Sequence, residues 1–295
     1  MDSKKISAFL TVNRLGSLTG AAEALNYTQS GMTHMMNALE KELGVTLLLR
    51  GRNGVRLTPA AQQLLPRMEA LVAATDTLER ELSELKGSGA PRIRVGAYTS
   101  MAQHWLPEIV RRFLQEFPAA DIAIRMEGLT DLYSLLKNGE LDCIFVSHHP
   151  EFLTADEEWL PLRNDELVAV LPDHYPVEGG LFSVQGFAEE EFLMPASDFA
   201  LDIDPVFSAA GVQPRIRRTN LDDPAIISMV EHGLGLSVLS ELVMRGRQDQ
   251  VIALPLTPPA YRELGIAYAA DRGSGELLRA FIRCARTTVM ELYRN

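Results

Sequence analysis

The stretch "GSLTGAAEALNYTQSGMTHMMNALEKELG", residues 16–44, decides the fold of the N-terminal part of the chain. It contains an alanine-rich helix suited to close packing and, after a short turn, a second helix that Thr28 caps. Apolar residues recur at helical spacing from Met32 to Leu43, and Gly44 ends the pattern. Two short helices joined by a tight turn are typical of a helix-turn-helix.

The flanking segments complete a winged form of this motif. Before it, "ISAFLTVNRL" (6–15) predicts an amphipathic helix that ends at Gly16. After it, "VTLLLRGRNGVRLT" (45–58) places two apolar runs around Asn53-Gly54, which is a strong hairpin signal. We therefore predict an all-α helix-turn-helix with a basic-tipped β-wing over residues 1–58.

A long helix with a leucine seam is predicted next, over residues 59–86. Pro59 fits its first turn, and the seam residues follow one another at alternating spacings of four and three. The seam consists of Leu64, Met68, Leu71, Thr75, Leu78, Leu82 and Leu85. A lone heptad seam needs a partner helix, so we expect this linker helix to dimerise. Residues 87–91 are rich in Gly and Ser and are expected to form a hinge.

Charge is distributed unevenly along the chain. The formal net charge is −11, but residues 1–58 hold seven Lys and Arg against four acids, so they carry +3 and the remainder carries −14. The basic end suits a polyanion, and the acidic remainder opposes unspecific binding to DNA. The sequence shows neither a membrane-spanning run nor a secretory signal, so we expect a cytoplasmic protein without membrane contact. Cys143 and Cys284 are expected to be reduced thiols.

From residue 92 onward, short strands alternate with helices, which indicates an open α/β domain over residues 92–295. We expect two similar lobes, lobe I over about 92–163 and 266–295 and lobe II over about 164–265, joined by crossing strands. Strands are predicted at 92–98, 121–127, 141–147, 166–172, 191–196, 214–219, 234–239, 251–256 and 263–270. Helices are predicted near 100–116, 130–138, 184–189, 201–210, 222–232 and 274–292.

The N-terminal arrangement resembles the LysR-type transcriptional regulators. The resemblance rests on "GSLTGAAEAL", on "TQS" at the start of the third helix, on "LEKELGVTLL", and on "GVRLTPA" after the wing, all in that family's order and spacing. Farther along, Gly139 to Asp142 (G-x-L-D) and "EHGLGLSVLS" (231–240) are similar to the family's effector domain.

Membership would imply a bacterial regulator that binds double-stranded promoter or operator DNA, at an interrupted palindrome, as a homodimer through the linker helix or as a homotetramer. It would also imply an effector domain that resembles a type 2 periplasmic binding protein and takes an unidentified small molecule between its lobes. No cofactor and no metal are expected besides this effector.

Candidate DNA contacts follow from the recognition helix and the wing. The N-terminal residues of such a helix reach base edges in the major groove, and here they are Gln29, Ser30, Thr33 and His34. Gln can pair with adenine, and Thr can offer its methyl group to thymine. Arg50, Arg52 and Arg56 flank the wing tip and suit phosphate or minor-groove contacts. Because the recognition helix carries little positive charge, the wing and dimerisation must supply much of the affinity.

Candidate effector contacts follow the carboxyl ends of the predicted strands, where open α/β folds bind ligands. They are Thr99, Ser100, Gly128, Leu129, Ser147, His148, Ser197, Asp198 and Asn220. A metal site at His148-His149 with Glu151 is disfavoured, because adjacent residues at a strand end point in different directions. For the run Arg215, Arg217 and Arg218 we favour a solvated face or a subunit contact over an anion site.

Two rival functions compete with regulation. The motifs G-x-S-x-G, the P-loop and H-E-x-x-H are absent from the sequence, and Gly233-Leu-Gly235 precedes a strand instead of following one, so we do not expect an enzyme. A solute-binding protein would explain residues 92–295 alone. The basic module fused before them favours a regulator.

Overall fold

The computed structural model describes residues 2–51, 54–85, 92–177, 179–195, 197–219, 221–247, 251–269 and 275–294. The described chain forms two compact units, one up to residue 85 and the other from residue 92 onward. Each unit has its own hydrophobic core.

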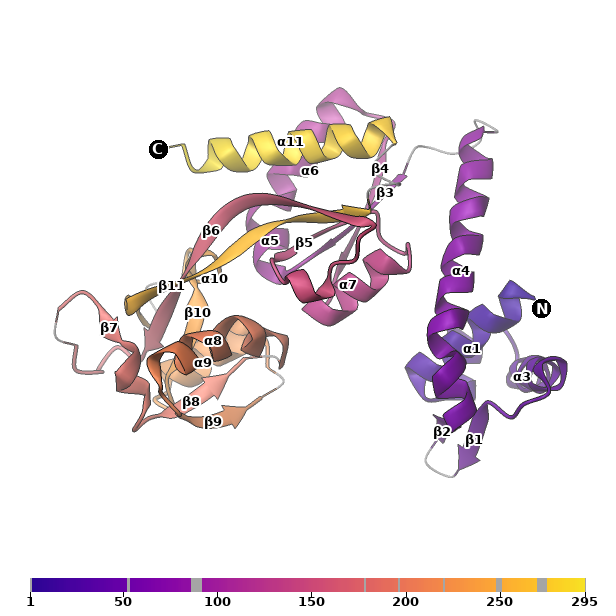
Figure 1. Ribbon diagram of the computed structural model, residues 1–295, viewed down its shortest axis with the longest axis horizontal. Coiled ribbons are helices and arrows are strands. Elements are labelled where there is room, and N and C mark those ends of the chain that lie inside the picture. Colours follow the sequence, from indigo (N-terminus) through magenta and orange to yellow (C-terminus); the bar gives the residue numbers. More distant parts are fainter. Residues whose placement is uncertain are drawn as a thin grey trace. The chain divides into compact units, whose positions relative to one another are not determined.

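The N-terminal unit begins with three short helices, α1 (Ser3–Leu15), α2 (Leu18–Ala24) and α3 (Gln29–Leu43) (Figure 1). Side chains of Asp2, Ser17 and Thr28 cap the helices by accepting hydrogen bonds from backbone N–H groups of their first turns. Gly16 and Gly44 follow α1 and α3 in the left-handed conformation, as the sequence predicts.

The wing is the antiparallel pair of β1 (Leu48–Gly51) and β2 (Gly54–Leu57), with Gly51 opposite Gly54. The predicted hairpin is therefore confirmed, and Arg52 and Asn53 lie outside the described residues. Gly54 has a φ of 109°, and a Cβ on it would lie 2.7 Å from the carbonyl oxygen of Gly16. The backbone N–H of Val55 donates to the same oxygen at 2.9 Å, which fixes the wing against the end of α1.

The long helix α4 (Pro59–Leu85) changes its role along its length. Met68, predicted as a seam residue, is only 6% exposed and packs with Leu65 and Val72 on the core of the N-terminal unit. That assignment was wrong because the first turns of α4 must cover this core. The other seam leucines with described side chains stay exposed: Leu64, Leu71, Leu78 and Leu82.

A mixed sheet forms the centre of the C-terminal unit. Its strands run in the order β10 (Ser237–Ser240), β6 (Glu157–Leu171), β11 (Ile252–Ala269), β5 (Cys143–Ser147), β3 (Arg92–Ala97) and β4 (Asp121–Met126). Strands β6 and β11 pair with each other almost end to end, and Figure 1 shows them as two long ribbons. The strands predicted at 251–256 and 263–270 are thus one strand with a register shift between Pro255 and Ala260.

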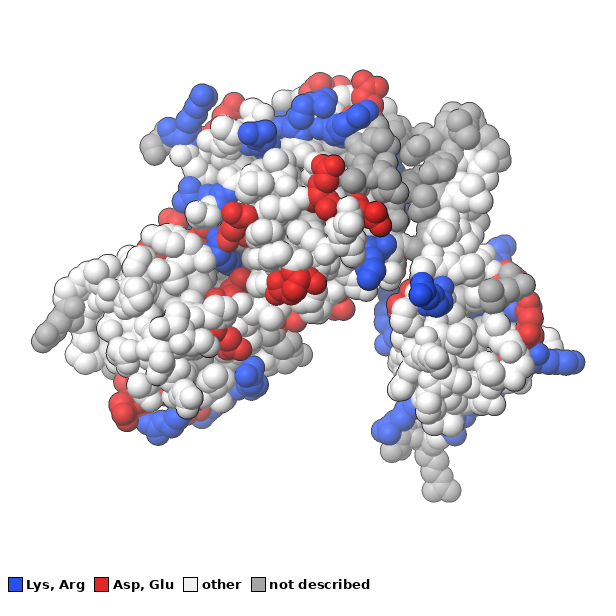
Figure 2. All heavy atoms as spheres, viewed as in Figure 1, with Lys and Arg blue, Asp and Glu red and all other residues white. Residues whose placement is uncertain are grey.

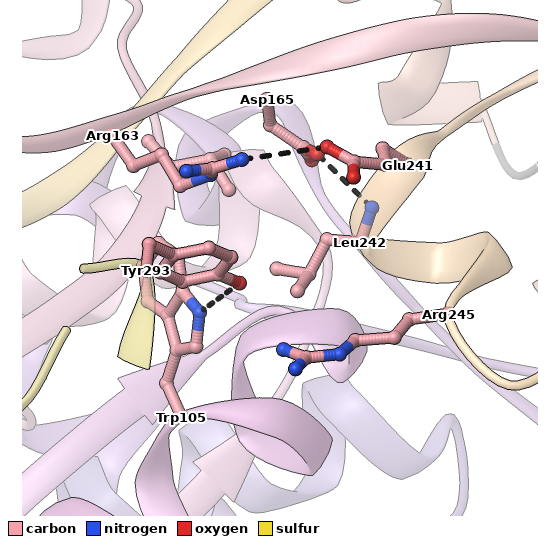
Figure 3. Close-up of a pocket in the computed structure, with 8 residues that line it drawn as sticks. Trp105, Arg163, Asp165, Glu241, Leu242, Arg245 and Tyr293 are labelled. Atoms are coloured by element: carbon pink, nitrogen blue, oxygen red, sulfur yellow. Dashed lines mark hydrogen bonds and ion pairs between the residues drawn. The ribbon is translucent and has the colours of Figure 1, made fainter. Parts of the chain in front are cut away.

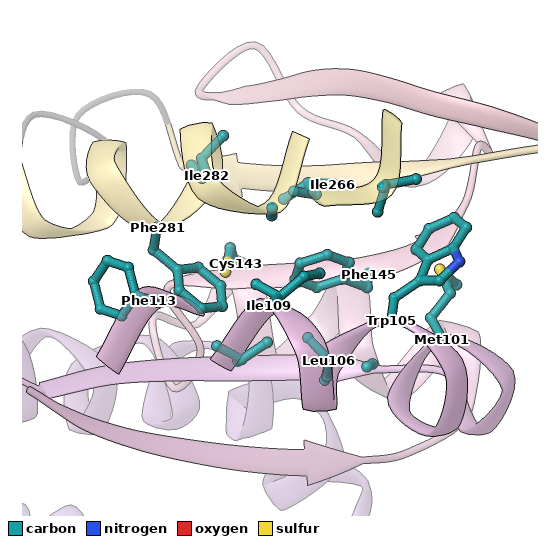
Figure 4. Packing of buried hydrophobic residues seen from close by; sticks show 14 of the residues in the cluster. Met101, Trp105, Leu106, Ile109, Phe113, Cys143, Phe145, Ile266, Phe281 and Ile282 are labelled. Atoms are coloured by element: carbon teal, nitrogen blue, oxygen red, sulfur yellow. The ribbon is translucent and has the colours of Figure 1, made fainter. Parts of the chain in front are cut away.

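Lobe I packs its helices on both faces of this sheet. On one face α6 (Leu106–Glu116) and α11 (Glu276–Leu292) enclose aromatic residues, with the Phe113 and Phe281 ring centroids 5.2 Å apart (Figure 4). On the other face lies α7 (Leu129–Lys137). The single helix predicted near 100–116 is divided at Trp105 into α5 (Thr99–His104) and α6. Pro107 explains the break, because a proline lacks the N–H that a continuous helix requires.

Lobe II contains the parallel pair β8 (Glu191–Met194) and β9 (Arg215–Arg218) with α8 (Ala200–Ala210), α9 (Asp223–Glu231) and the short α10 (Glu241–Met244). The short strand β7 (Phe182–Ser183) pairs with β11, and η1 (Pro150–Phe152) and η3 (Ser197–Phe199) are single 3₁₀ turns. The helix predicted near 184–189 is also a 3₁₀ turn, η2 (Val184–Phe187). Gly186 within it faces the ring of Phe182, where a Cβ would be only 2.8 Å away.

The predicted fold class is confirmed: an N-terminal winged helix-turn-helix with a long helix, followed by a two-lobed α/β domain. Cys143 and Cys284 are free thiols, and burial raises the pKa of each. Within the described residues, no helix combines the length and the apolar character that crossing a membrane requires.

Candidate functional site

The predicted recognition residues lie together along one edge of α3. The buried side of this helix is occupied by its own core, because Met32 and Met36 are at most 1% exposed. At the helix start, the Thr28 hydroxyl accepts from the N–H of Gly31 at 3.1 Å. The residues left toward solvent are Gln29, Ser30 and His34, which are exposed, and Thr33, which is half-buried.

The wing is attached to this edge through Arg50. Its Nη2 donates to Oδ1 of Asn37 on α3 at 2.5 Å and lies 3.6 Å from Oε2 of Glu40. Arg50 therefore holds the wing and the recognition helix in one surface. Arg56 is exposed on β2, and Arg52 lies outside the described residues. Asn37 carries no signal in the sequence as the partner of a wing arginine, because the two residues meet only after the hairpin folds back on α3.

A cavity of about 650 Å³ lies between the two lobes of the C-terminal unit. Lobe I contributes the segments after β3 and β4, and lobe II contributes the turn after β8, the start of α9 and Val243 of α10. Its lining includes residues 98–100, 103, 126–128, 130–131, 195, 198–199, 221–224, 243 and 262. A cavity of this volume suits a small organic molecule, and it lies where open α/β sheets bind ligands.

The floor of the cavity contains a buried arginine on the crossing strand β11. Arg262 is 5% exposed, and its Nε and Nη2 donate to Oδ2 of Asp165 at 3.0 and 2.9 Å. The Nη2 also donates to the hydroxyl of Ser240 at 2.8 Å. On its other side, Nη1 lies 3.7 Å from Oδ2 of Asp202. The buried carboxylates of Asp165 and Asp202 thus compensate the charge of Arg262 at the place where β6 and β11 cross from one lobe to the other.

A histidine extends this ionic network from lobe I to lobe II. Nε2 of His149 lies 3.1 Å from Oδ1 of Asp202 on α8, and Nδ1 lies 3.3 Å from Glu151. Burial alone would lower the pKa of His149, but its hydrogen bond to Asp202 and the charges of Asp202 and Glu151 outweigh burial and raise it. Burial, with the charge of Asp202, also raises the pKa of Tyr98, so that side chain stays a neutral hydroxyl.

The predicted effector contacts divide into three groups. Thr99, Ser100, Gly128 and Asp198 all line the cavity, so the structure brings these four together. Leu129, Ser147 and His148 do not line it: Leu129 is fully buried in lobe I, Ser147 is 1% exposed near Asp202, and His148 stacks on Trp159 at 4.6 Å. These three positions follow strands or begin helices, but their side chains turn toward the core or another face. The side chain of Ser197 and all of Asn220 lie outside the described part.

Several lining residues carried no signal in the sequence. Arg262 sits in the middle of a strand, far along the chain from the lobe I segments, and only strand pairing brings it to the cavity. Asp131 and Asp223 look like ordinary acids in the first turns of α7 and α9. Within the described ranges, no three His, Cys, Asp or Glu side chains are grouped in a way that could hold a metal ion.

A second cavity of about 300 Å³ lies at another face of the crossing strands (Figure 3). The guanidinium carbon of Arg163 lies 3.8 Å from the centroid of the Tyr293 ring, and the Tyr293 hydroxyl accepts from Nε1 of Trp105 at 3.0 Å. Arg163 also reaches Glu241 at 3.4 Å. The two cavities share a wall, since Asp165 lines this one and binds Arg262 in the other.

Basic side chains of the C-terminal unit gather along α11 (Figure 2), where Arg279, Arg283 and Arg286 are exposed. None of the three lines the inter-lobe cavity. The strand β9 is exposed throughout, and its Arg217 pairs with Glu191 at 2.9 Å.

Two family models match the chain. The model described as "Bacterial regulatory helix-turn-helix protein, lysR family" matches residues 3–62, and the model "LysR substrate binding domain" matches residues 86–289. The chain belongs to the LysR family. It is a DNA-binding transcriptional regulator with a substrate-binding effector domain.

Relatives align with this LysR-family regulator over nearly its full length. The HTH-type regulator YvbU of Bacillus subtilis (strain 168), described as uncharacterized, is 25% identical over 97% of this chain and 98% of its own. The solved structure of CbnR, a LysR family transcriptional regulator, superposes with a TM-score of 0.69 at 21% identity and covers 98% of this chain and 99% of that one. The regulatory domain of Synechocystis CcmR, solved in complex with 2-PG, covers 68% of this chain and 97% of that one at 20% identity, with a TM-score of 0.61.

Proposed function

We propose that this LysR-family regulator reads operator DNA with the exposed edge of α3 and the wing, and responds to a small molecule in the inter-lobe cavity. The observation that carries the proposal is the division of α3 into a side filled by its own core and a polar edge that makes no contribution to that core. On that edge Gln29, Thr33 and His34 can reach bases in a major groove. The tether between Arg50 and Asn37 keeps the wing beside it.

Binding to the DNA upstream of its own coding region tests this role. Fluorescence anisotropy of the full chain at about 0.15 M salt should show specific binding, and Gln29→Ala should weaken it about tenfold or more. Lys41→Ala is the matched control, because Lys41 is exposed at the opposite end of α3. Equal affinity of wild type and Gln29→Ala on specific DNA would show that α3 does not read bases.

We propose dimerisation through α4, with a tetramer as the larger assembly. Leu71 and Leu78 are 37% and 57% exposed, lie one heptad apart, and are not part of the described hydrophobic core of the N-terminal unit. A two-fold pair of recognition helices would then read an interrupted palindrome. Leu71→Glu together with Leu78→Glu should give monomers by light scattering, whereas an unchanged mass would exclude this interface.

We propose that the cavity holds the effector and that ligand binding changes the angle between the lobes. The lobes meet through the long strands β6 and β11, whose pairing shifts register on both sides of Arg262, and residues of both lobes line the cavity. The CcmR regulatory domain, of the same fold, was solved with a ligand. We propose action by binding and not by catalysis, without a cofactor, in the cytoplasm where promoter DNA lies. Operator affinity measured with and without a stabilising ligand tests the coupling, and identical affinities would contradict it.

A further inference from the structure

The charge of the inter-lobe cavity is strongly one-sided. Among its described lining residues the acids are Glu127, Asp131, Asp198, Asp222 and Asp223, and the one cation is Arg262. The guanidinium of Arg262 already forms an ion pair with Asp165, from Nη2 to Oδ2 at 2.9 Å. Its Nη1 also lies 3.7 Å from Oδ2 of Asp202. Arg262 therefore offers a ligand little net positive charge, and a concave site with a low-dielectric wall concentrates the negative potential of the acids.

Two of these acids have a hydrogen-bond or ion-pair partner, and three have none among the described residues. Glu127 pairs with Arg125 at 2.9 Å, and Asp222 caps α9 by accepting from the N–H of Ala225 at 3.1 Å. The carboxylates of Asp131, Asp198 and Asp223 make no hydrogen bond or ion pair with any residue that the structure describes. They come from different lobes, since Asp131 is on α7 and the other two belong to lobe II.

Asp223 is a half-buried acid of the cavity wall. Burial, with the nearby charge of Asp222, raises its pKa, although the charges of Arg262 and Arg247 oppose the shift. Because burial is the leading cause, the direction of this shift marks Asp223 as a partly desolvated carboxyl group in the cavity wall. Asp198 reaches across the cavity, because its Oδ2 would lie only 2.3 Å from a Cβ placed on Gly128 of lobe I.

The remaining walls are apolar and aromatic. Tyr98, Met126, Phe199 and Leu221 line the cavity between the acids. The ring of Phe199 already faces a cation, with the Arg262 guanidinium carbon 5.3 Å from its centroid. Aromatic faces beside carboxylates favour ammonium and guanidinium groups on a carbon body.

We propose that the effector of this cavity is a small organic cation, an amine or guanidinium compound, held between Asp131 of lobe I and Asp198 and Asp223 of lobe II. The inference rests on the proposed function of the cavity as the effector site. A cation bound to carboxylates of both lobes at once would draw the lobes together. A neutral polyol could donate hydrogen bonds to the same carboxylates but would leave their charge uncompensated.

Three probes with one carbon skeleton test the charge of the ligand. We would measure the Tm of the full chain with 1,4-diaminobutane, 1,4-butanediol and adipate, which share a four-methylene chain and differ in their end groups. At about ten times its dissociation constant, the diamine should raise Tm by roughly 2–4 °C and the other two should not. A shift with adipate or butanediol equal to that of the diamine overturns the cationic class but leaves an effector cavity.

Variants separate a ligand site from a structural role. Asp198→Asn and Asp223→Asn should weaken binding of the diamine at least about tenfold while leaving Tm without ligand nearly unchanged, because these carboxylates have no hydrogen-bond or ion-pair partner among the described residues. Asp204→Asn, an exposed acid on α8 outside the cavity, is the matched control and should bind as wild type. An undiminished diamine shift in both cavity variants overturns the proposal. No shift with any probe overturns it too, and DNA binding of the same protein then shows whether the regulator function stands.

Discussion

The recognition edge of α3 and the inter-lobe cavity use polar residues in opposite ways. On α3 the recognition residues are exposed, apart from the half-buried Thr33, and they are not part of the core beneath them. Below the cavity, Arg262, Asp165 and Asp202 are almost fully buried and depend on one another for charge compensation. Changes at the first surface should therefore affect DNA affinity alone, whereas changes below the cavity should affect folding.

The largest expected effect is the loss of Arg262. Arg262→Met leaves the buried carboxylate of Asp165 without its cation, so the effector domain should lose about 3–5 kcal/mol of unfolding free energy in urea titrations. Arg279→Met removes an exposed arginine of α11 and should change stability by less than about 0.5 kcal/mol. Similar small losses of unfolding free energy in both variants would show that the buried charges below the cavity stabilise the fold no more than an exposed arginine does.

The link between His149 and Asp202 should make the stability of the effector domain depend on pH. Folding raises the pKa of His149, so its stabilisation is fully present below the pKa of the unfolded chain and disappears as pH rises through the folded pKa. His149→Gln should cost about 1–3 kcal/mol at pH 5.5 and clearly less at pH 8.5. His174→Gln, in an exposed pair with Asp173, is the matched control and should change stability by less than about 0.5 kcal/mol. A pH-independent difference for His149→Gln would exclude the charged link.

Neighbouring residues of α3 should separate stability from recognition. Thr28→Ala removes the cap to Gly31 and should cost about 1 kcal/mol in thermal unfolding. Ser30→Ala, two residues later and exposed, should leave Tm nearly unchanged. A loss at Ser30 as large as that at Thr28 would show that the polar edge of α3 does contribute to folding.

The smallest effect on the protein itself is expected at the wing. Arg56 is exposed and makes no ion pair among the described residues, so Arg56→Ala should leave stability within about 0.5 kcal/mol. If it contacts a phosphate, the salt dependence of operator binding should decrease by about one unit in a plot of log K against log salt. An unchanged slope would place Arg56 away from the DNA backbone.

Local signals predicted the N-terminal unit well because its helices are short and strongly patterned. Thr28 caps the start of α3, and Gly16 and Gly44 end α1 and α3, as predicted. These interactions involve only the neighbouring backbone, so the local sequence is enough to predict them. The prediction failed at Met68, because a heptad pattern does not distinguish a partner helix from the core of the same domain. Trp105, where one predicted helix became two, marks a break that Pro107 signals in the sequence.

The sequence by itself determined the family, the order of the domains and the edge of α3 that faces solvent, because each depends on residues close together along the chain. The tertiary structure alone decided the cavity. It brings Asp131, Asp198 and Asp223 around one space, sets Arg262 against Asp165, and turns Leu129 and Ser147 away into the core. Strand position shows which end of the sheet a residue occupies, but only packing shows where its side chain points and whether its charge is compensated.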